Sequence, residues 1–313
     1  DGVFNISRGA KTHAEVIYCE ITEDGVTGRG ESVPYKRYGE TIDGVINSIK
    51  IVSEAVESGL SRIELQSVMP AGATRNAVDC ALWDLELKLS NTPAEKRLGL
   101  NGTGTLTTAY TISLGEAEAM YQAAVKNAHR PLLKIKTGTR DDAERLRAVR
   151  RGAPNSKIIV DANEGWREDN LAFHLQIAKE CDVALIEQPL PAGSDEMLAH
   201  IDHLVPLCAD ESVHLANDLE ALKDRYDAIN IKLDKTGGLT EALTMKAKAQ
   251  ELCFQIMVGC MVGTSLGMAP AIFLAQGVDY VDLDGPLLLA KDRSPSLRYT
   301  DSIVYPPTSD LWG

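Results

Sequence analysis

Five short apolar segments in the middle of the chain each end near a charged residue, and these charges recur at a steady interval. They are, in order, Lys136, Asp161, Glu187, Asp210 and Lys232. Successive charges are 25, 26, 23 and 22 residues apart, which matches the length of one strand, one helix and two short loops. Charged side chains at the carboxyl ends of successive strands are typical of the site of a (β/α) barrel. The spacing therefore predicts that all five side chains converge at one end of such a barrel.

Three of these residues, Asp161, Glu187 and Asp210, are carboxylates on consecutive predicted strands. Oxygen ligands without cysteine or histidine suit a hard cation, with Mg²⁺ as the first choice. Taken singly, each acid is better explained as a salt-bridge partner or a helix N-cap. Three acids at the matching position of consecutive strands favour the metal site, because clustered carboxylates repel one another unless a cation lies between them.

Lys134 and Lys136 lie two residues apart in the predicted strand 132–137, so their side chains share one face. An ordinary surface strand also carries such pairs. In a closed barrel of eight strands, however, this strand and the one that carries Lys232 are the second and the sixth, and they face each other. Two amines on opposite faces of one carbon suit a racemisation or epimerisation, in which one removes the α-proton and the other delivers a proton.

A lysine base needs a pKa below its usual value of about 10.4, which nearby positive charge would provide. A Schiff-base lysine is the other use of a barrel lysine, but it does not require three carboxylates and is less favoured. Glu211, Asn163 and Asn230 lie beside the expected ligands and could support them from behind.

Asp282 and Asp284 share a face of the last predicted strand. They could bind a cationic group of a substrate, or they could be an acidic pair before the turn at Gly285-Pro286, and the spacing favours neither.

Loops of the first hundred residues carry further charges that could cover the mouth of the barrel and meet an anionic group. A single surface arginine is more often just solvated. These loop residues are Arg8, Lys11, Arg37 and Tyr38.

The architecture predicted from residue 105 onward is α/β, with strands and helices in alternation. Eight strands are expected near 105–114, 132–137, 157–163, 183–188, 205–210, 228–234, 253–260 and 280–284, with helices such as 141–151, 170–180 and 241–251 between them. Eight alternating strands favour a closed barrel. An open doubly wound sheet would need a glycine-rich phosphate loop after its first strand, and no GxGxxG occurs there.

A separate α+β domain is expected over residues 1–100. Strands at 13–21 and 26–32 flank the turn Asp24-Gly25, and helices are predicted near 42–56 and 75–89. In the second helix the apolar stripe excludes Trp83 and Asp84 and ends at Leu89. The catalytic barrel would cover 101–290, and the Pro- and Ser-containing tail, 291–313, is expected to return to the first domain.

Composition narrows the class of protein further. The 313 residues carry a net charge of −13, which argues against nucleic acid or an anionic membrane as a partner. No apolar run is long enough to cross a bilayer. Six scattered cysteines without CxxC spacing, and no visible signal peptide, predict a reducing, cytoplasmic location.

Seven motifs together resemble the enolase superfamily, in its muconate-lactonising subgroup, and within it the L-Ala-D/L-Glu type of dipeptide epimerases. They are residues 76–84 (NAVDCALWD), 134–136 (KIK), 161–163 (DAN), 187–189 (EQP), 209–212 (ADES), 231–238 (IKLDKTGG) and 282–286 (DLDGP). The resemblance spans nearly the whole chain. It implies a (β/α)7β TIM-like barrel with an N-terminal α+β capping domain.

The resemblance also implies a mechanism. One Mg²⁺ per subunit would be held by Asp161, Glu187 and Asp210, and it would stabilise an enediolate formed when the α-proton of the C-terminal residue leaves. Lys136 and Lys232 would be the two acid/base groups of this 1,1-proton transfer. Lys134 matches the lysine that helps to neutralise the enolate oxygen.

Further residues match substrate contacts of the family. Asp282 and Asp284 correspond to the pair that binds the dipeptide's α-ammonium, and Thr111 to a contact at the end of the first strand. Cys260 and Val262 fall where the family lines the pocket on strand seven. The arginine that meets the second residue's carboxylate matches Arg8, with Lys11 as its rival, although the first capping strand is shorter here than in the family.

Other functions stay open at this point. The superfamily uses the same barrel for cycloisomerisation, o-succinylbenzoate synthesis and N-acyl amino acid racemisation, and fold and metal site do not separate these. An inactive barrel that binds a small molecule is an alternative of another class. The implied partner is a dipeptide, plausible in the recycling of cell-wall peptides, and a homo-oligomer is expected only by analogy.

Overall fold

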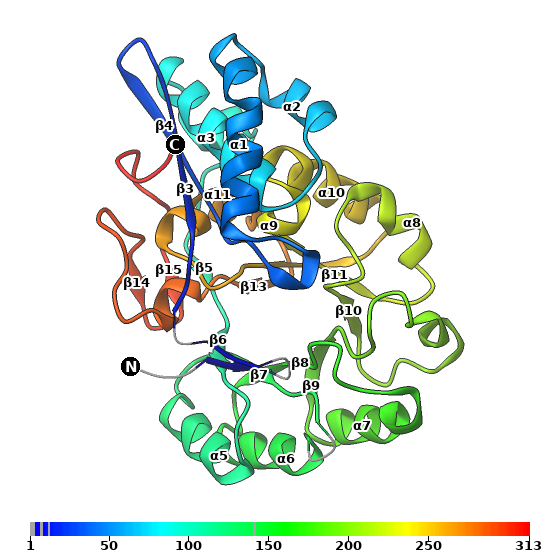
Figure 1. The fold of residues 1–313 in the computed structure, drawn as a ribbon. Coiled ribbons are helices and arrows are strands. Elements are labelled where there is room, and N and C mark those ends of the chain that lie inside the picture. Colours follow the sequence, from blue (N-terminus) through cyan, green and yellow to red (C-terminus); the bar gives the residue numbers. More distant parts are fainter. Residues whose placement is uncertain (1–3, 7–8, 12, 140–141) are drawn as a thin grey trace.

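The computed structural model describes residues 4–6, 9–11, 13–139 and 142–313, and its larger part is a barrel (Figure 1). Eight parallel strands lie in chain order around it, as the sequence predicts. A backbone hydrogen bond of 2.8 Å from Ala109 N to Val281 O joins the first strand region to the last. The strands are β6 (Tyr110–Ile112), β7 (Leu132–Lys136), β8 (Lys157–Asp161), β9 (Val183–Glu187), β10 (Leu207–Ala209), β11 (Ala228–Lys232), β12 (Gln255–Gly259) and β13 (Tyr280–Asp282).

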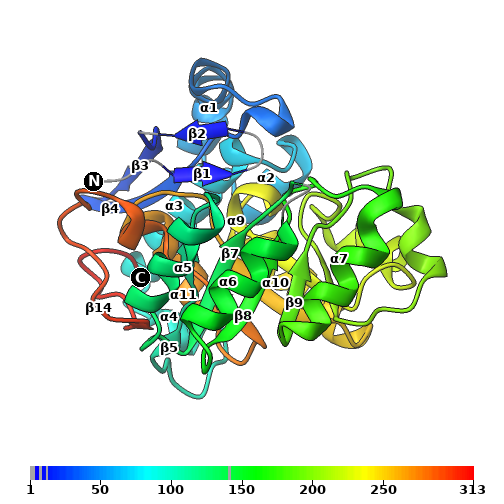
Figure 2. The ribbon, with the colours of Figure 1, turned by 90° about the horizontal axis from the view of Figure 1, so that it is seen from below.

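Helices surround the strands, which Figures 1 and 2 show from two directions. The predicted helices at 141–151, 170–180 and 241–251 are present as α6, α7 and α10. Among the described residues of the barrel, the helices are α5 (Ala117–Lys126), α6 (Asp142–Gly152), α7 (Glu168–Glu180), α8 (Leu219–Leu222), α9 (Leu233–Thr236), α10 (Leu239–Glu251) and α11 (Ser265–Leu274), with the 3-10 turns η2 (Glu196–His200), η3 (Ala216–Asp218) and η4 (Gly285–Leu288). No helix among the described residues is both long and apolar enough to cross a membrane.

One interval departs from the expected strand–helix–strand pattern. Between Glu187 and Asp210 the described chain contains the short turn η2 and no α-helix. Pro189 and Pro191 restrict the start of this segment, and Gly193 follows with a φ of 79°. Proline lacks the N–H that a helix interior needs, so the segment crosses as a loop.

A small N-terminal α+β domain lies beside the barrel (Figure 1). The turn at Asp24-Gly25, with both φ values positive, joins two antiparallel strands as predicted. The elements are β1 (Phe4–Ile6), β2 (Gly9–Lys11), β3 (Ile17–Glu23), β4 (Val26–Ser32), η1 (Lys36–Tyr38), α1 (Ile42–Glu57), α2 (Arg62–Val68), α3 (Ala73–Leu89) and α4 (Ala94–Arg97).

Helix α3 is buried on nearly all sides, unlike the one-sided helix predicted for this segment. Trp83 and Asp84 are buried, whereas Leu89 at the end of the predicted stripe is 41% exposed. Strand β4 lies against the helix so closely that a Cβ at Gly30 would stand 2.1 Å from the carbonyl oxygen of Ala77. Only glycine allows this approach, and it covers a face of α3 that would otherwise meet water.

Hydrogen bonds connect the capping domain to the barrel. Asp234 on α9 accepts from Val33 N at 2.9 Å and from Asn76 Nδ2 at 2.8 Å, and Arg75 on α3 donates to the carbonyl oxygens of Thr236 and Gly237. These bonds fix α3 against the chain that follows β11.

The tail contacts both parts of the molecule. Its strands β14 (Tyr299–Thr300) and β15 (Ile303–Val304) form a small sheet with β5 (Leu106–Thr107). At the very end, Trp312 Nε1 donates to the carbonyl oxygen of Cys80 at 3.0 Å, and Gly313 N donates to Asp84. The tail therefore packs on helix α3 as well as on the start of the barrel.

The buried carboxyl group of Asp234 makes stability depend on pH. Burial raises its pKa to about 7, from 3.8 in the unfolded chain. The folded protein holds this proton more tightly, so the contribution to stability is fully present below about pH 4 and is lost as pH rises through about 7. We expect Asp234→Asn to flatten this fall in the free energy of unfolding, measured by urea titration across that range.

The exposed Asp224 provides the control for this measurement, and Asp224→Asn should keep the wild-type dependence on pH. An Asp234→Asn protein with a slope as steep as that of the wild type would contradict the prediction.

Candidate active site

Alternating side chains along the barrel strands point inward and form layers. The layer nearer the start of the strands is apolar. It consists of Ala109, Leu132, Ile159, Leu185, Cys208, Ala228, Met257 and Tyr280. Two positions further along the same strands, the inward side chains are polar: Lys134, Asp161, Glu187, Asp210, Asn230 and Asp282. Because side chains in a strand alternate with a period of two, both layers face the barrel axis.

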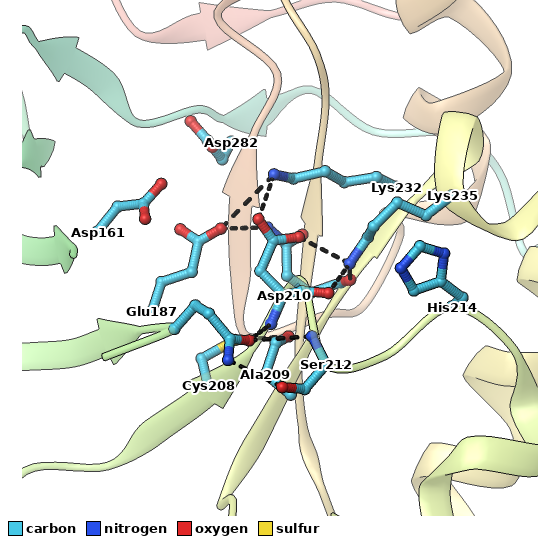
Figure 3. Close-up of polar contacts among 12 residues, drawn as sticks. Asp161, Glu187, Cys208, Ala209, Asp210, Ser212, His214, Lys232, Lys235 and Asp282 are labelled. Atoms are coloured by element: carbon cyan, nitrogen blue, oxygen red, sulfur yellow. Dashed lines mark hydrogen bonds and ion pairs between the residues drawn. The ribbon is translucent and has the colours of Figure 1, made fainter. Parts of the chain in front are cut away.

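Strand register sets the relative height of the acids. Asp161 and Glu187 are direct register partners on β8 and β9. Asp210 lies just beyond β10, where Cys208 is the residue paired with Glu187. The sequence pattern predicted matching positions for the three acids, but Asp210 is not in register with Asp161 and Glu187. Figure 3 nevertheless shows all three along one side of a common space.

Two lysines connect the three acids. Lys134 Nζ lies 2.6 Å from Glu187 Oε2, 2.7 Å from Asp282 Oδ2 and 3.1 Å from Asp161 Oδ2. Lys232 Nζ lies 2.7 Å from Asp210 Oδ2 and 3.7 Å from Glu187 Oε1. These side chains are almost completely inaccessible to solvent, so each charge is balanced by neighbours rather than by water.

Lys136 completes the group by contacting Asp161 Oδ2 at 2.5 Å. Lys134 and Lys136 come from β7, while Lys232 comes from β11, four strands further along the sheet. In the closed barrel these strands lie opposite each other, which gives the arrangement expected for a reaction with two amines.

The pKa values in this group reflect competition between burial and charge. Burial alone would lower the pKa of Lys134 and Lys232, but neighbouring carboxylates raise both well above the usual value. This direction is opposite to the lowering expected for a working base, because carboxylates rather than cations surround the amines.

The pKa values of the three acids shift in two different directions. Burial raises the pKa of Asp161 and Asp210, but the adjacent lysines outweigh it and hold both values below the usual range. For Glu187, burial and the charge of Asp161 raise the pKa to about 7. The central acid of the three is thus the one that binds a proton most readily.

Strand β13 brings Asp282 and Asp284 to the same end of the barrel. Both are buried; Asp282 contacts Lys134, and Asp284 accepts a hydrogen bond of 2.7 Å from Thr111 N. Burial, followed by the charge of Asp282, raises the pKa of Asp284 to about 7. Cys260 and Val262 follow β12 and are partly exposed.

A loop of the capping domain reaches the barrel mouth at η1. Arg37 donates through Nε and Nη2 to both carboxylate oxygens of Glu164, at 2.9 and 2.8 Å, and Glu164 follows β8. The ring of Tyr38 packs edge-on against His214, which follows β10, with centroids 4.6 Å apart. Arg8 lies outside the described residues, and for Lys11 only the backbone in β2 is described.

Sequence reasoning missed two buried side chains that contact Asp210. Lys235 Nζ lies 2.7 Å from Asp210 Oδ1, and Gln188 Oε1 accepts from the backbone N–H groups of Asp210 and Ser212. Lys235 sits in the short helix α9, where no apolar periodicity marks it as buried. Its place three residues after Lys232, within the motif at 231–238, is the signal that could have identified it.

The charge and donor chemistry of the site fit a divalent cation. Within the described part of the chain, six buried acids gather at this end of the barrel against four buried lysines: Asp161, Glu187, Asp210, Glu211, Asp282 and Asp284 against Lys134, Lys136, Lys232 and Lys235. The excess of carboxyl oxygens suits Mg²⁺. No three acids in the described residues are close enough to enclose a cation as they stand, since lysine amines lie between them.

Two protein-family models match the chain. The model described as "Mandelate racemase / muconate lactonizing enzyme, N-terminal domain" matches residues 3–99, and "Enolase C-terminal domain-like" matches 116–306.

Several known proteins are similar over nearly the whole length. L-Ala-D/L-Glu epimerase of Escherichia coli is 44% identical, covering 95% of this chain and 93% of the relative. N-acetyl-D-glutamate racemase of a Pseudoalteromonas species is 45% identical, covering 95% of both.

Solved structures of dipeptide epimerases and related proteins are similar to this chain as well. An enolase family member from Agrobacterium tumefaciens, with homology to dipeptide epimerases and with bound sodium and L-Ala-L-Glu, is 61% identical. It has a TM-score of 0.98 and covers 100% of this chain and 96% of its own. Dipeptide epimerases complexed with Mg and a dipeptide have TM-scores of 0.86 to 0.90 at 27 to 28% identity.

The bonds of Lys134 predict a large effect on stability. Lys134→Met would leave three buried carboxyl groups without their shared ammonium, so we expect the free energy of unfolding to fall by about 3 kcal/mol or more. Urea titration measures this change. Lys157→Met, at the exposed start of β8, should change it by no more than about 0.5 kcal/mol. Equal losses in both variants would show that the carboxylates do not depend on Lys134.

Proposed function

This chain belongs to the enolase superfamily, in the branch of mandelate racemase and muconate-lactonising enzymes, and we propose that it is a Mg²⁺-dependent dipeptide epimerase that interconverts L-Ala-L-Glu and L-Ala-D-Glu. The observation that carries the proposal is the pair of buried amines on opposite strands, with the buried carboxylates of Asp282 and Asp284 at the same end of the barrel. It is an isomerase, as its named relatives are.

The reaction needs one base and one acid on opposite faces of the α-carbon. Lys136 on β7 and Lys232 on β11 come from opposite sides of the barrel. One amine would take the α-proton of the C-terminal residue, leaving the electron pair delocalised into the carboxylate as an enediolate. The other would deliver its proton from the far side, and the configuration would be inverted.

Asp161, Glu187 and Asp210 would hold the magnesium ion. When bound, the ion supplies positive charge that makes the α-proton more acidic. Lys134, already among these acids, would lie near the enediolate oxygen and help to balance its charge. Asp282 and Asp284 would bind the dipeptide ammonium, and Thr111 would support Asp284 through its backbone N–H.

The amines also need their pKa lowered before they can act as bases. The carboxylates that raise the pKa of Lys232 are the same groups proposed to bind the cation. Balancing their charge would bring that pKa toward the range in which lysine exchanges protons.

The loops over the mouth would select the side chain of the second residue. We include Arg8 in the proposal, with Lys11 as its rival, as the group that would meet the glutamate carboxylate. Cys260 and Val262 would line the pocket from the β12 side.

Racemisation of N-acylated glutamate is a second candidate, because the racemase from Pseudoalteromonas is as similar to this chain as the epimerase from Escherichia coli. An N-acyl group carries no ammonium. The two substrates therefore differ in what Asp282 and Asp284 would bind.

Exchange of the α-proton in D₂O tests the reaction. With Mg²⁺ and a panel of L-Ala-L-Xaa dipeptides, proton NMR should show the Xaa α-proton disappearing first for Glu, with accumulation of the D epimer, and EDTA should stop it. In Lys136→Ala and Lys232→Ala, epimerisation should fall at least about 10³-fold, and each variant should retain exchange with only one epimer. Exchange with no dipeptide would refute the epimerase.

Substitution of one strand-eight acid separates the two candidate substrates. Asp284→Asn removes a negative charge facing the ammonium, so kcat/KM for L-Ala-L-Glu should fall about 10²-fold, while that for N-acetyl-L-glutamate should not fall. Asp301→Asn, at an exposed turn, is the control. Equal losses on both substrates would contradict the assignment of Asp284 to ammonium binding.

A further inference from the structure

Lys235 is a fully buried lysine that the proposed proton transfer does not use. It lies in α9, and only 1% of its surface is exposed. Burying an ammonium group is costly unless every donor finds a partner. Its contacts therefore show what the group does.

The ammonium group of Lys235 has one ion pair and two hydrogen bonds within the described protein. Nζ lies 2.7 Å from Asp210 Oδ1 and also donates to the carbonyl oxygens of Asp210 and Asn230. Two of these acceptors are backbone groups, which keep their place whatever the pH. In this respect Lys235 differs from Lys232, whose described contacts are all carboxylates.

Lys235 contacts one of the two carboxylate oxygens of Asp210. Figure 3 shows Lys235 and Lys232 reaching it from two sides, with Lys232 bound to Oδ2 at 2.7 Å on the side of Glu187. Lys235 at Oδ1 and Lys232 at Oδ2 together restrict the rotation of this carboxylate. Behind it, Gln188 Oε1 accepts from Asp210 N at 2.9 Å and fixes the backbone.

We propose that Lys235 is a positioning residue, which orients Asp210 as a magnesium ligand and takes no part in proton transfer. The inference rests on the proposed metal site. A lysine that served only as a counter-charge would have the opposite effect, because its removal would leave Asp210 more negative and the site more attractive to a cation. The sign of the change in metal affinity thus decides between the two roles.

The test measures binding of Mg²⁺ alone to the full chain, by calorimetry and by the shift in melting temperature that the metal causes. We expect Lys235→Met to bind Mg²⁺ at least about tenfold more weakly, the effect usual for a group that supports a metal ligand. Lys235→Gln, which keeps donors for the two carbonyls, serves if the Met variant does not fold, and it should show the same loss. Either variant with unchanged or tighter binding overturns the proposal.

Lys246 provides a matched control. It is also partly buried and also donates to two backbone carbonyls, those of Leu274 and Gln276, but it lies on α10 and contacts no residue of the site. Lys246→Met should lose stability and keep the wild-type affinity for Mg²⁺. An equal loss of affinity in this variant would show a general effect of removing a buried lysine and would overturn the proposal.

A kinetic measurement separates this role from acid/base catalysis. At saturating Mg²⁺, Lys235→Met should exchange the α-protons of both epimers in D₂O, whereas a variant lacking a base keeps exchange with only one. Loss of exchange with a single epimer would assign Lys235 to proton transfer instead. A wild-type protein that binds Mg²⁺ but exchanges no dipeptide would refute the epimerase and leave the role of Lys235 intact.

Discussion

Alternation of side chains along parallel strands is the constraint on which this site depends. In every barrel strand except β12, the inward residue nearer the start of the strand belongs to the apolar layer and the next inward residue is charged or polar. The apolar layer closes the barrel from below, so the charges above it cannot be hydrated from that side. They must therefore pair with one another, and the register of neighbouring strands decides which pairs form.

These pairs give each lysine two demands that conflict. Lys134 and Lys232 stabilise the buried acids as ammonium groups, and the acids in turn raise the pKa of both amines. A base must release that proton. A site that holds acids with lysines can therefore act in acid/base chemistry only when something else balances part of the acidic charge, which is the part that a bound dication would play in the proposed reaction.

The two lysines that contact Asp210 show how similar side chains can lie in different surroundings. One carboxylate oxygen of Asp210 contacts Lys232, which we propose as an acid/base group, and the other contacts Lys235, which donates to backbone carbonyls. The two lysines are three residues apart in sequence, but one ends a strand and the other lies inside a helical turn. Their different surroundings, rather than their chemistry, separate their roles.

The capping domain is joined firmly to the barrel at one end and touches its mouth at the other. Asp234 and Arg75 connect α3 and α9 through buried hydrogen bonds. At the mouth, Arg37 reaches Glu164 through a contact that is partly exposed to solvent. Solvent screens such a pair, so the loop is held less strongly than the helix, as suits a cover over a site that must admit its substrate.

The sequence by itself determined the order and positions of the eight strands, because each is a short apolar run whose boundaries are local. It also determined the spacing of Lys136, Asp161, Glu187 and Lys232, and the motifs were specific enough to indicate the family. Tertiary structure decided the rest. It buried Trp83 and Asp84, raised the pKa values of Lys134 and Lys232 and brought Lys235 to Asp210. Each of these depends on distant neighbours or on the exact path of the chain, and local periodicity carries no information about such contacts.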